Sequence, residues 1–386
     1  MITRRRMLTQ GAMLTVPAFL SACKAGPRLA GPHGMDPEAN AKAQGMSDPI
    51  LTAMNAGITA PNPHNTQAWK FRILGPVSML LYVDEKRILP VTDPTTRQIH
   101  IGQGTFLEVL KLQAARNGYA AKLELFPEGT YPLKDTGKKP VARVSLVKDD
   151  SVRPEPLSSF IPERATNRDE YEGQLLQESE LAQILAAAAP EKSHIGFADA
   201  AQMKELLPIL FQGMEIESRS RRLGEESRIW FRFNDSEIQT KRDGIALPDQ
   251  GMSGFMRWIT ETFFLGPEPE KFFDRSSTDI FLSSYKKKID SAKALVYWKT
   301  ASNTMADWVE CGRDYVRFQL ALTQADLKMH PLSQCLQEYE EMNDLRPRVE
   351  KILGQSGSEK IQMIARIGRS SYRYFTPRRN LKDMIL

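Results

Sequence analysis

The sequence predicts an α+β protein in which one chain contains two related halves. Two observations predict the mixed class: short apolar runs that can pair as strands across a turn, and longer runs whose apolar residues leave little polar face. A third observation predicts the halves, because a helical phrase recurs later in the chain. At 386 residues, 41% hydrophobic and 26% charged, the chain has ordinary globular composition and ample length for two packed halves.

The elements follow from local patterns. Residues 50–58 are expected to be helical, and the runs 69–74 and 78–83 are expected to pair as strands across Gly75-Pro76. Residues 104–117 predict a helix that is buried on most sides. Residues 141–147 are a further strand candidate.

Two helical segments carry the repeat. Gly104-x-x-Leu107-x-x-Leu110-x-Leu112 has an echo in Gly312-x-x-Tyr315-x-x-Phe318-x-Leu320, and each arrives before another apolar stretch. Buried helices share composition, so the match alone is also compatible with chance. A true tandem repeat would let one chain imitate a homodimer.

The first 23 residues are predicted to be an export signal. Thr3-Arg4-Arg5-Arg6-Met7-Leu8 forms a twin-arginine box, and the apolar stretch from Gly11 to Leu20 is too short to span a bilayer. Leu20-Ser21-Ala22-Cys23 reads as a lipobox, so Cys23 is expected to carry the lipid, with a short helical anchor as the alternative. We therefore expect a twin-arginine substrate that becomes a periplasmic or cell-surface lipoprotein, with residues 24–48 as a flexible tether.

Other functional classes lack their signals. Cys311 and Cys335 are expected to be buried thiols rather than a disulfide framework. The net charge of +5 includes the signal arginines, so no nucleic-acid partner is expected. The five histidines are too scattered for a metal motif, and neither a dinucleotide fingerprint nor a Gly-x-Ser-x-Gly elbow is present.

The first candidate binding segment is Pro61-Asn62-Pro63-His64-Asn65-Thr66-Gln67-Ala68-Trp69, which contains no Lys, Arg, Asp or Glu. Pro61 and Pro63 restrict the backbone and favour an extended or turn conformation. The carboxamides of Asn65 and Gln67 offer donors and acceptors that suit a ligand edge carrying N–H, C=O and hydroxyl groups. The plainer interpretation is a helix-to-strand turn with Trp69 in the core.

The second candidate segment is Arg164-Ala165-Thr166-Asn167-Arg168. In an extended backbone, residues at i, i+2 and i+4 lie on one face, so Arg164, Thr166 and Arg168 would converge there. Two guanidinium groups and one hydroxyl make a suitable phosphate site. The alternative is a solvated charged loop.

Both segments resemble motifs of the nitroreductase superfamily. The first is similar to a Pro-Ser-Ser-x-Asn-Ser-Gln-Pro-Trp signature, with Asn62 and Ala68 as departures, and the second to an Arg-x-Ser-x-Arg phosphate segment. The resemblance implies antiparallel-rich sheets flanked by helices and an FMN site between two halves. It implies Pro61, Asn62, Pro63, Asn65, Gln67, Arg164, Thr166 and Arg168 as cofactor contacts.

The order of the motifs is reversed relative to that family, which a fused pseudo-dimer with one FMN site explains. We expect a first half at 49–150 and a second half at 151–386, with an insertion at about 228–288 that is a candidate lid. The resemblance also places Leu332 and Ser333 beside the flavin and Arg378 at the phosphate. The plainer interpretation of Leu332 and Ser333 is a helix–loop–helix turn, and that of Arg378 is a basic tail.

These expectations combine into an exported, lipid-anchored FMN oxidoreductase. Electrons or hydride would pass through the flavin to a small acceptor such as a nitro compound or quinone. NAD(P)H, a quinol or another carrier would be the donor, and no protein group is assigned as catalytic. The alternatives are a non-catalytic FMN-binding protein with a lidded site, and a structural lipoprotein on the same scaffold.

Overall fold

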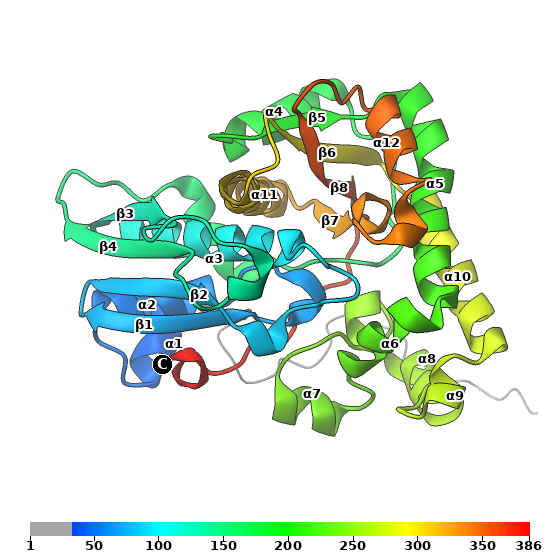
Figure 1. Cartoon of the computed structure of the whole chain (residues 1–386), viewed down its shortest axis with the longest axis horizontal. Coiled ribbons are helices and arrows are strands. Elements are labelled where there is room, and N and C mark those ends of the chain that lie inside the picture. Colours follow the sequence, from blue (N-terminus) through cyan, green and yellow to red (C-terminus); the bar gives the residue numbers. More distant parts are fainter. Residues whose placement is uncertain (1–32) are drawn as a thin grey trace, which may run out of the picture.

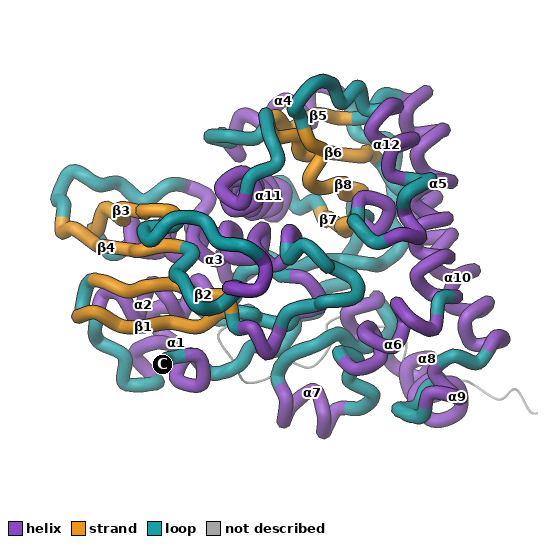
Figure 2. The backbone as a smooth tube through the Cα atoms, in the orientation of Figure 1, coloured by secondary structure: helices purple, strands orange, loops and turns teal. Residues whose placement is uncertain are grey.

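The computed structural model describes residues 33–386, apart from the side chains of Phe263 and Phe264. Its named strands form two four-stranded antiparallel sheets (Figure 1; Figure 2). One has the order β1 (Trp69–Gly75), β2 (Ser78–Val83), β4 (Ala142–Lys148), β3 (Tyr119–Leu125). The other has the order β5 (His194–Phe197), β6 (Ala294–Thr300), β8 (Lys360–Gly368), β7 (Lys328–Pro331). The predicted α+β class is confirmed.

The two sheets follow one chain path. In each half a long helix follows the second strand, namely α3 (Arg97–Arg116) and α11 (Met305–Gln324). A shorter helix precedes the first strand, namely α2 (Pro49–Gly57) and α4 (Glu178–Ala188). Counted from the first strand of each half, the two sheets have the same strand order. The chain therefore contains two related halves.

The long helices α3 and α11 pack against each other at the centre of the molecule (Figure 1). A Cβ atom on Gly104 would lie 1.8 Å from the backbone oxygen of Val309, and one on Gly312 would lie 1.9 Å from that of Ile101. Each glycine thus meets the carbonyl three residues before the other glycine. This reciprocal contact is that of a pseudo-two-fold axis, and it explains the glycine repeat.

One apolar cluster runs through both halves and includes Trp69 of β1 and Trp298 of β6. A second apolar cluster lies where the sheet of β5, β6, β8 and β7 meets α5 (Ala200–Arg219) and α12 (Arg346–Ile352). Cys311 and Cys335 are buried free thiols, as expected. None of the helices described is long and apolar enough to cross a bilayer.

Helix α3 begins at Arg97, before the predicted start at residue 104. The carboxylate of Asp93 accepts the backbone N–H groups of Gln98 and Ile99, which fixes the first turn. Buried polar side chains, including Arg97 and His100, interrupt the apolar pattern there. The apolar periodicity therefore did not predict residues 97–103, the first two turns of α3.

The insertion occupies residues 198–293 between β5 and β6, whereas β1 and β2 are joined by a short turn. It carries the helices α5, α6 (Arg221–Ile229), α7 (Asp235–Lys241), α8 (Gly254–Ile259), α9 (Pro269–Phe272) and α10 (Arg275–Asp290). Figure 2 shows that this region of the second half is helices and loops. The predicted insertion at 228–288 lies within it.

Both chain ends depart from the expected boundaries. Residues 24–32 lie outside the described residues, but from His33 onward the expected tether is part of the body, because α1 (Pro37–Ala43) packs on α2 and buries Ala41. Asn55 of α2 fixes α1 through a hydrogen bond to the oxygen of Pro37. At the other end, Ile385 bridges Phe71 of β1, so the C-terminal tail returns to the first half.

Candidate functional site

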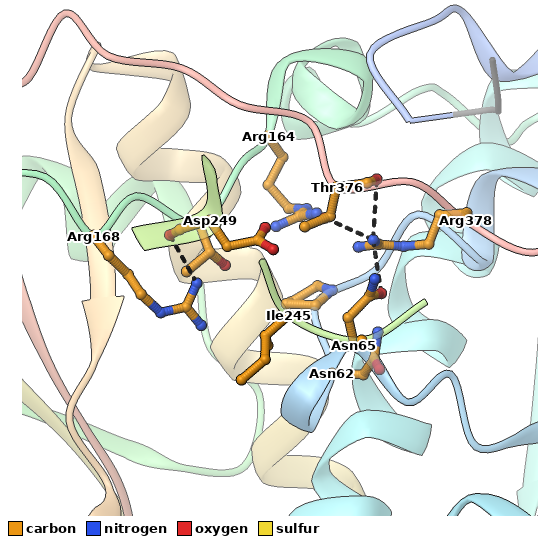
Figure 3. A pocket seen from close by; sticks show the side chains of 11 residues that line it. Asn62, Asn65, Arg164, Arg168, Ile245, Asp249, Thr376 and Arg378 are labelled. Atoms are coloured by element: carbon orange, nitrogen blue, oxygen red, sulfur yellow. Dashed lines mark hydrogen bonds between the residues drawn. The ribbon is translucent and has the colours of Figure 1, made fainter. Parts of the chain in front are cut away.

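A pocket lies where the α2–β1 connection, the segment before α4, the insertion and the C-terminal tail meet (Figure 3). It encloses about 390 Å³ of space between protein atoms, part of it open to solvent. The lining residues are Pro61, Asn62, Asn65, Arg164, Thr166, Arg168, Gly244, Ile245, Asp249, Thr376 and Arg378. The two candidate segments, far apart in the sequence, thus meet at one site.

The wall segment 61–69 is a strained helix-to-strand turn. The side-chain oxygen of Asn62 accepts the backbone N–H of Gln67 at 2.8 Å, and buried Trp69 donates to the oxygen of Gly102. His64, Asn65 and Gln67 have positive φ angles of 48°, 50° and 51°. Such conformations are uncommon for residues other than glycine and persist where surrounding contacts impose them. The structure of this segment is therefore the helix-to-strand turn of the plainer interpretation, and Pro61, Asn62 and Asn65 of the turn line the pocket.

Arg164 is the most deeply buried of the pocket arginines. Its guanidinium donates to the side-chain oxygen of Gln319 at 3.1 Å and to the backbone oxygen of Thr59 at 2.8 Å. It also lies 2.9 Å from Nε2 of His33. The His33 ring reaches the backbone oxygen of Arg164 through Nε2 at 2.7 Å and that of Thr376 through Nδ1 at 3.0 Å, and its tautomer decides which of the two accepts a hydrogen bond. The Nε of Arg164 has no hydrogen-bond partner among the described residues. Burial lowers the pKa of Arg164 to about 10.

Arg378 closes the C-terminal end of α2. Its guanidinium donates to the backbone oxygens of Ile58, the C-cap of that helix, and of Thr59 and Ala60, which follow it. It also donates to the side-chain oxygen of Asn65 at 2.9 Å. Burial, followed by the charge of Arg164, lowers the pKa of Arg378 to about 9. Arg378 is therefore buried in the pocket lining and is not part of an exposed basic tail.

Arg168 and Asp249 bring the segment before α4 and the insertion together. Arg168 donates to the backbone oxygen of Asp249 at 3.3 Å. The carboxylate of Asp249 accepts the backbone N–H of Ala246 at 2.8 Å, and burial raises its pKa to about 6. Figure 3 shows the Asp249 side chain among the arginines of the pocket.

Arg164, Arg168 and Arg378 form no ion pair within the described part of the chain, although other arginines do. Among the described lining residues, Asp249 is the one carboxylate facing these three guanidinium groups. Burial of excess charge is costly, so such a site favours a bound counter-ion. Guanidinium groups match the geometry of phosphate and carboxylate oxygens. The pocket is thus suited to an anion.

Residues 243–249 of the insertion form a loop, the roof loop, which contributes Gly244, Ile245 and Asp249 to the pocket lining. Gly244 donates its backbone N–H to the oxygen of Asn65 at 3.1 Å, and the hydroxyl of Tyr372 donates to Pro248 at 2.8 Å. Asp243 pairs with both Arg232 and Arg87. These contacts hold the roof loop against the first half and the tail, and its role as a lid stays a prediction.

Three polar side chains, those of His64, Ser227 and Glu217, contact one another in series from segment 61–69 into the insertion. His64 lies 3.2 Å from the hydroxyl of Ser227, which lies 3.5 Å from a carboxylate oxygen of Glu217. Burial, then the charge of Arg168, lowers the pKa of His64 to about 4. Burial raises the pKa of Glu217 to about 7.

Four predicted contacts do not line the pocket, namely Pro63, Gln67, Leu332 and Ser333. The side chain of Gln67 is used structurally: it accepts the N–H of Arg379 and donates to the oxygen of Arg242. Leu332 donates its N–H to Ile364, and the hydroxyl of Ser333 accepts the N–H of Ile364. These groups are occupied by the β7–β8 edge and lie outside the lining of this pocket, and a flavin contact at Leu332 and Ser333 stays a prediction.

The sequence reasoning missed several pocket groups, namely Gly244, Ile245, Asp249 and Thr376 in the lining, and His33 and Gln319 behind Arg164. Gln319 carried a signal, because it lies seven residues after Gly312 on the helix with the repeat. The roof residues carried none, because their position depends on how a long insertion folds back.

No protein-family model matches this sequence. A protein of Mycobacterium tuberculosis named "Putative NAD(P)H nitroreductase" is 29% identical over 145 residues, which cover 37% of this chain and 40% of that protein. A second, "Putative NAD(P)H nitroreductase acg" of the same species, is 32% identical over 87 residues, 22% of this chain and 26% of the relative. The chain thus spans less than half the length of the curated relatives it matches.

The FMN-dependent nitroreductase NfnB of Mycobacterium smegmatis, solved with NADPH, is 14% identical, and the match covers 59% of this chain and 96% of that one with a TM-score of 0.36. A nitroreductase-like protein of Bacillus cereus is 12% identical, covering 59% and 92% with a TM-score of 0.33.

Proposed function

We propose that this protein is an FMN-binding oxidoreductase of the nitroreductase type that passes electrons or hydride to a small acceptor such as a nitro compound or a quinone. The carrying observation is the convergence of Arg164, Arg168 and Arg378, which form no salt bridge among the described residues and face the single carboxylate of Asp249 in the pocket lining. The partnerless Nε of buried Arg164 is a donor that a phosphate oxygen would satisfy. Partial sequence similarity to NAD(P)H nitroreductases supports the assignment.

The residues present fit the phosphate of FMN. Arg164, Arg168, Arg378 and the hydroxyl of Thr166 would hold the phosphate, while Pro61, Asn62 and Asn65 would form the wall. Ile245 and the roof loop would exclude water from the pocket. When bound, FMN would supply the redox chemistry through its ring. The protein would contribute binding, orientation and exclusion of water.

The phosphate assignment predicts a ligand-specific effect of Arg168→Ala. Arg168 is partly exposed and makes one weak backbone contact, so its loss should leave the fold intact. The loss of a charge-assisted hydrogen bond should weaken FMN binding by about 10–100-fold. Riboflavin, which lacks the phosphate, should bind both proteins equally, as measured by quenching of flavin fluorescence.

Exposed Arg143 on β4 is the matched control, and Arg143→Ala should bind FMN like the wild type. Equal affinity of Arg168→Ala and wild type for FMN would refute the phosphate site. Arg164→Ala combined with Arg168→Ala is expected to abolish binding at micromolar FMN.

A second function, non-catalytic binding of FMN, is favoured by the fixed roof, because Asp243, Gly244 and Pro248 are all held by the rest of the body. Anaerobic absorption spectra separate the two functions. A flavin band bleached by NADPH supports the reductase, and bleaching only by dithionite supports binding alone or another donor.

Export by the twin-arginine route and a lipid on Cys23 form part of the same proposal. Both rest on the residues before 24, which lie outside the described structure. A donor other than NAD(P)H, such as a quinol, would then be needed outside the cytoplasm. Radiolabelled palmitate incorporated by wild type and lost in Cys23→Ser would support the lipid.

A further inference from the structure

The carboxylate of Asp249 lies in a pocket whose other charged lining groups are arginines. Asp249 is at the end of the roof loop, within the short 3-10 helix Leu247–Gln250, and is 7% exposed. Figure 3 shows its side chain among Arg164, Arg168 and Arg378. An ionised carboxylate in this position repels a bound anion unless a proton lies between the two groups.

The two oxygens of the Asp249 carboxylate differ in their partners. Oδ2 accepts the backbone N–H of Ala246 at 2.8 Å. Within residues 33–386, Oδ1 accepts no hydrogen bond and the carboxylate forms no ion pair. An ionised carboxylate only accepts hydrogen bonds, whereas a protonated carboxyl also donates one. Oδ1 can therefore meet a ligand oxygen through one proton, while Oδ2 stays fixed to the backbone.

The surroundings of Asp249 bring its ionisation close to neutral pH. The charged or titratable groups that act on it electrostatically are Arg168, Arg257, Arg378, Tyr372 and Tyr374. Burial raises the pKa of Asp249 to about 6, although the three arginines act in the opposite direction. Burial raises the pKa of each tyrosine further above neutral, and guanidinium groups stay charged there. Asp249 is thus the group in these surroundings whose charge changes between pH 5 and 7.5.

Phosphate and sulfate differ in the proton that they can share with such a carboxyl. The second ionisation of a phosphate monoester has a pKa of about 6, so its oxygen and the Asp249 carboxyl bind a proton with similar strength. Sulfate carries no proton in this range and gains a hydrogen bond from Asp249 only after the carboxyl is protonated. At pH 7.5 that protonation lowers the affinity about 30-fold.

We propose that Asp249 makes the pocket selective for phosphate over sulfate by sharing one proton with the bound phosphate. The proton lies between Oδ1 and a phosphate oxygen, while the arginines neutralise the remaining charge. A fully ionised monoester takes this proton from water when it binds, whereas a monoprotonated phosphate brings it. The inference rests on the phosphate site of the proposed function, but not on the flavin ring or on turnover.

Isothermal titration calorimetry with inorganic phosphate and with sulfate tests the selectivity. At pH 7.5 we expect the wild type to prefer phosphate by about ten-fold or more, and at pH 5, where Asp249 is protonated, the preference should disappear. Asp249→Asn keeps an oxygen for the N–H of Ala246 but has no proton to share. It should bind the two anions within about two-fold of each other at pH 7.5.

Asp307→Asn is the matched control. Asp307 also accepts the N–H of the residue three positions before it, Thr304, at 2.8 Å, but it does not line the pocket. This variant should keep the preference of the wild type. Equal affinity of the wild type for the two anions at pH 7.5 would overturn the inference, and so would a failure to bind either anion at millimolar concentration.

Proton uptake separates this inference from the proposed flavin function. In two buffers of different ionisation enthalpy at pH 7.5, binding of FMN to the wild type should take up about one proton, and binding to Asp249→Asn almost none. Phosphate selectivity in a protein that does not bind FMN would support the inference and refute the flavin function. FMN bound without proton uptake, and displaced equally well by sulfate and phosphate, would support the flavin function and overturn the inference.

Discussion

Arginines on the two sides of the central helix pair differ in their partners. Arg313 and Arg317 of α11 are paired with buried Glu108, and Glu155, Glu191 and Glu310 complete the network. Arg164, Arg168 and Arg378 make no such pairs within residues 33–386. A buried ion pair compensates the desolvation of both groups, so the first set is structural. The second set is held by neutral oxygens, and the Nε of Arg164 has no partner among the described residues.

Asp249 places a negative charge beside this ligand site. Burial raises its pKa to about 6, so protonation below that pH should remove a charge that repels a bound anion. We expect sulfate, whose charge is constant in this range, to bind about ten-fold more tightly at pH 5 than at pH 7.5.

Asp249→Asn should bind sulfate at pH 7.5 as tightly as the wild type does at pH 5 and should lose the pH dependence. Isothermal titration calorimetry with sodium sulfate measures both. The same pH dependence in Asp249→Asn would assign the effect to another group.

Glu217 is a second buried carboxyl whose charge is unfavourable. Its folded pKa of about 7 lies above the unfolded value of 4.5, so the folded state holds the proton longer and stability falls as pH rises from 4.5 to 7. Glu217→Gln should therefore increase the free energy of unfolding by up to about 3 kcal/mol at pH 8 and by little at pH 4.5. Urea unfolding at both pH values tests the sign, and a variant that is less stable at pH 8 would contradict it.

At the scale of elements, the crossing of α3 and α11 depends on two glycines. A methyl group on Gly104 would overlap the oxygen of Val309, so the helices would have to separate. We expect Gly104→Ala and Gly312→Ala each to destabilise the protein by about 3 kcal/mol or more. Gly75→Ala, where no atom lies within 4 Å, is the control and should change stability by less than about 0.5 kcal/mol. Thermal unfolding compares the three.

Apolar periodicity and turn residues predicted the bounds of β1, β2 and α2 well. The strand pair at β1 and β2 and the helix α2 were within a residue or so of their predicted bounds, because each depends on periodicity and a turn. The first turns of α3 were missed, since Arg97, Gln98 and His100 are buried through tertiary partners such as Glu338 and Tyr131. Sequence periodicity does not record burial of that kind.

At the scale of the whole molecule, the site was predictable where motifs carried it. Arg164, Thr166, Arg168, Arg378, Pro61, Asn62 and Asn65 meet in one pocket, as expected. His33 was assigned to a tether, because its burial depends on Phe375 and Thr376 at the opposite end of the chain. Asp249 and Ile245 were missed for the same reason: long-range folding of the insertion has no local sequence signal.

The pseudo-two-fold axis also predicts how many ligands one chain binds. Gln319, seven residues after Gly312, bonds to Arg164 and Thr166 at the pocket. Its counterpart Lys111, seven residues after Gly104, pairs with Glu191 and Glu108 in the neutralised network of Arg313 and Arg317. The second potential site is therefore filled by protein charges.

We expect one FMN per chain in equilibrium dialysis at saturating FMN, and two per chain would refute the argument. Glu108→Gln should leave two buried arginines without their shared partner and lower the free energy of unfolding by about 3–5 kcal/mol. Because Glu108 does not line the pocket, the variant that remains folded should still bind one FMN with unchanged affinity. Such a result would show that the ion pairs of Glu108 contribute to stability, whereas FMN binding depends on the pocket arginines Arg164, Arg168 and Arg378.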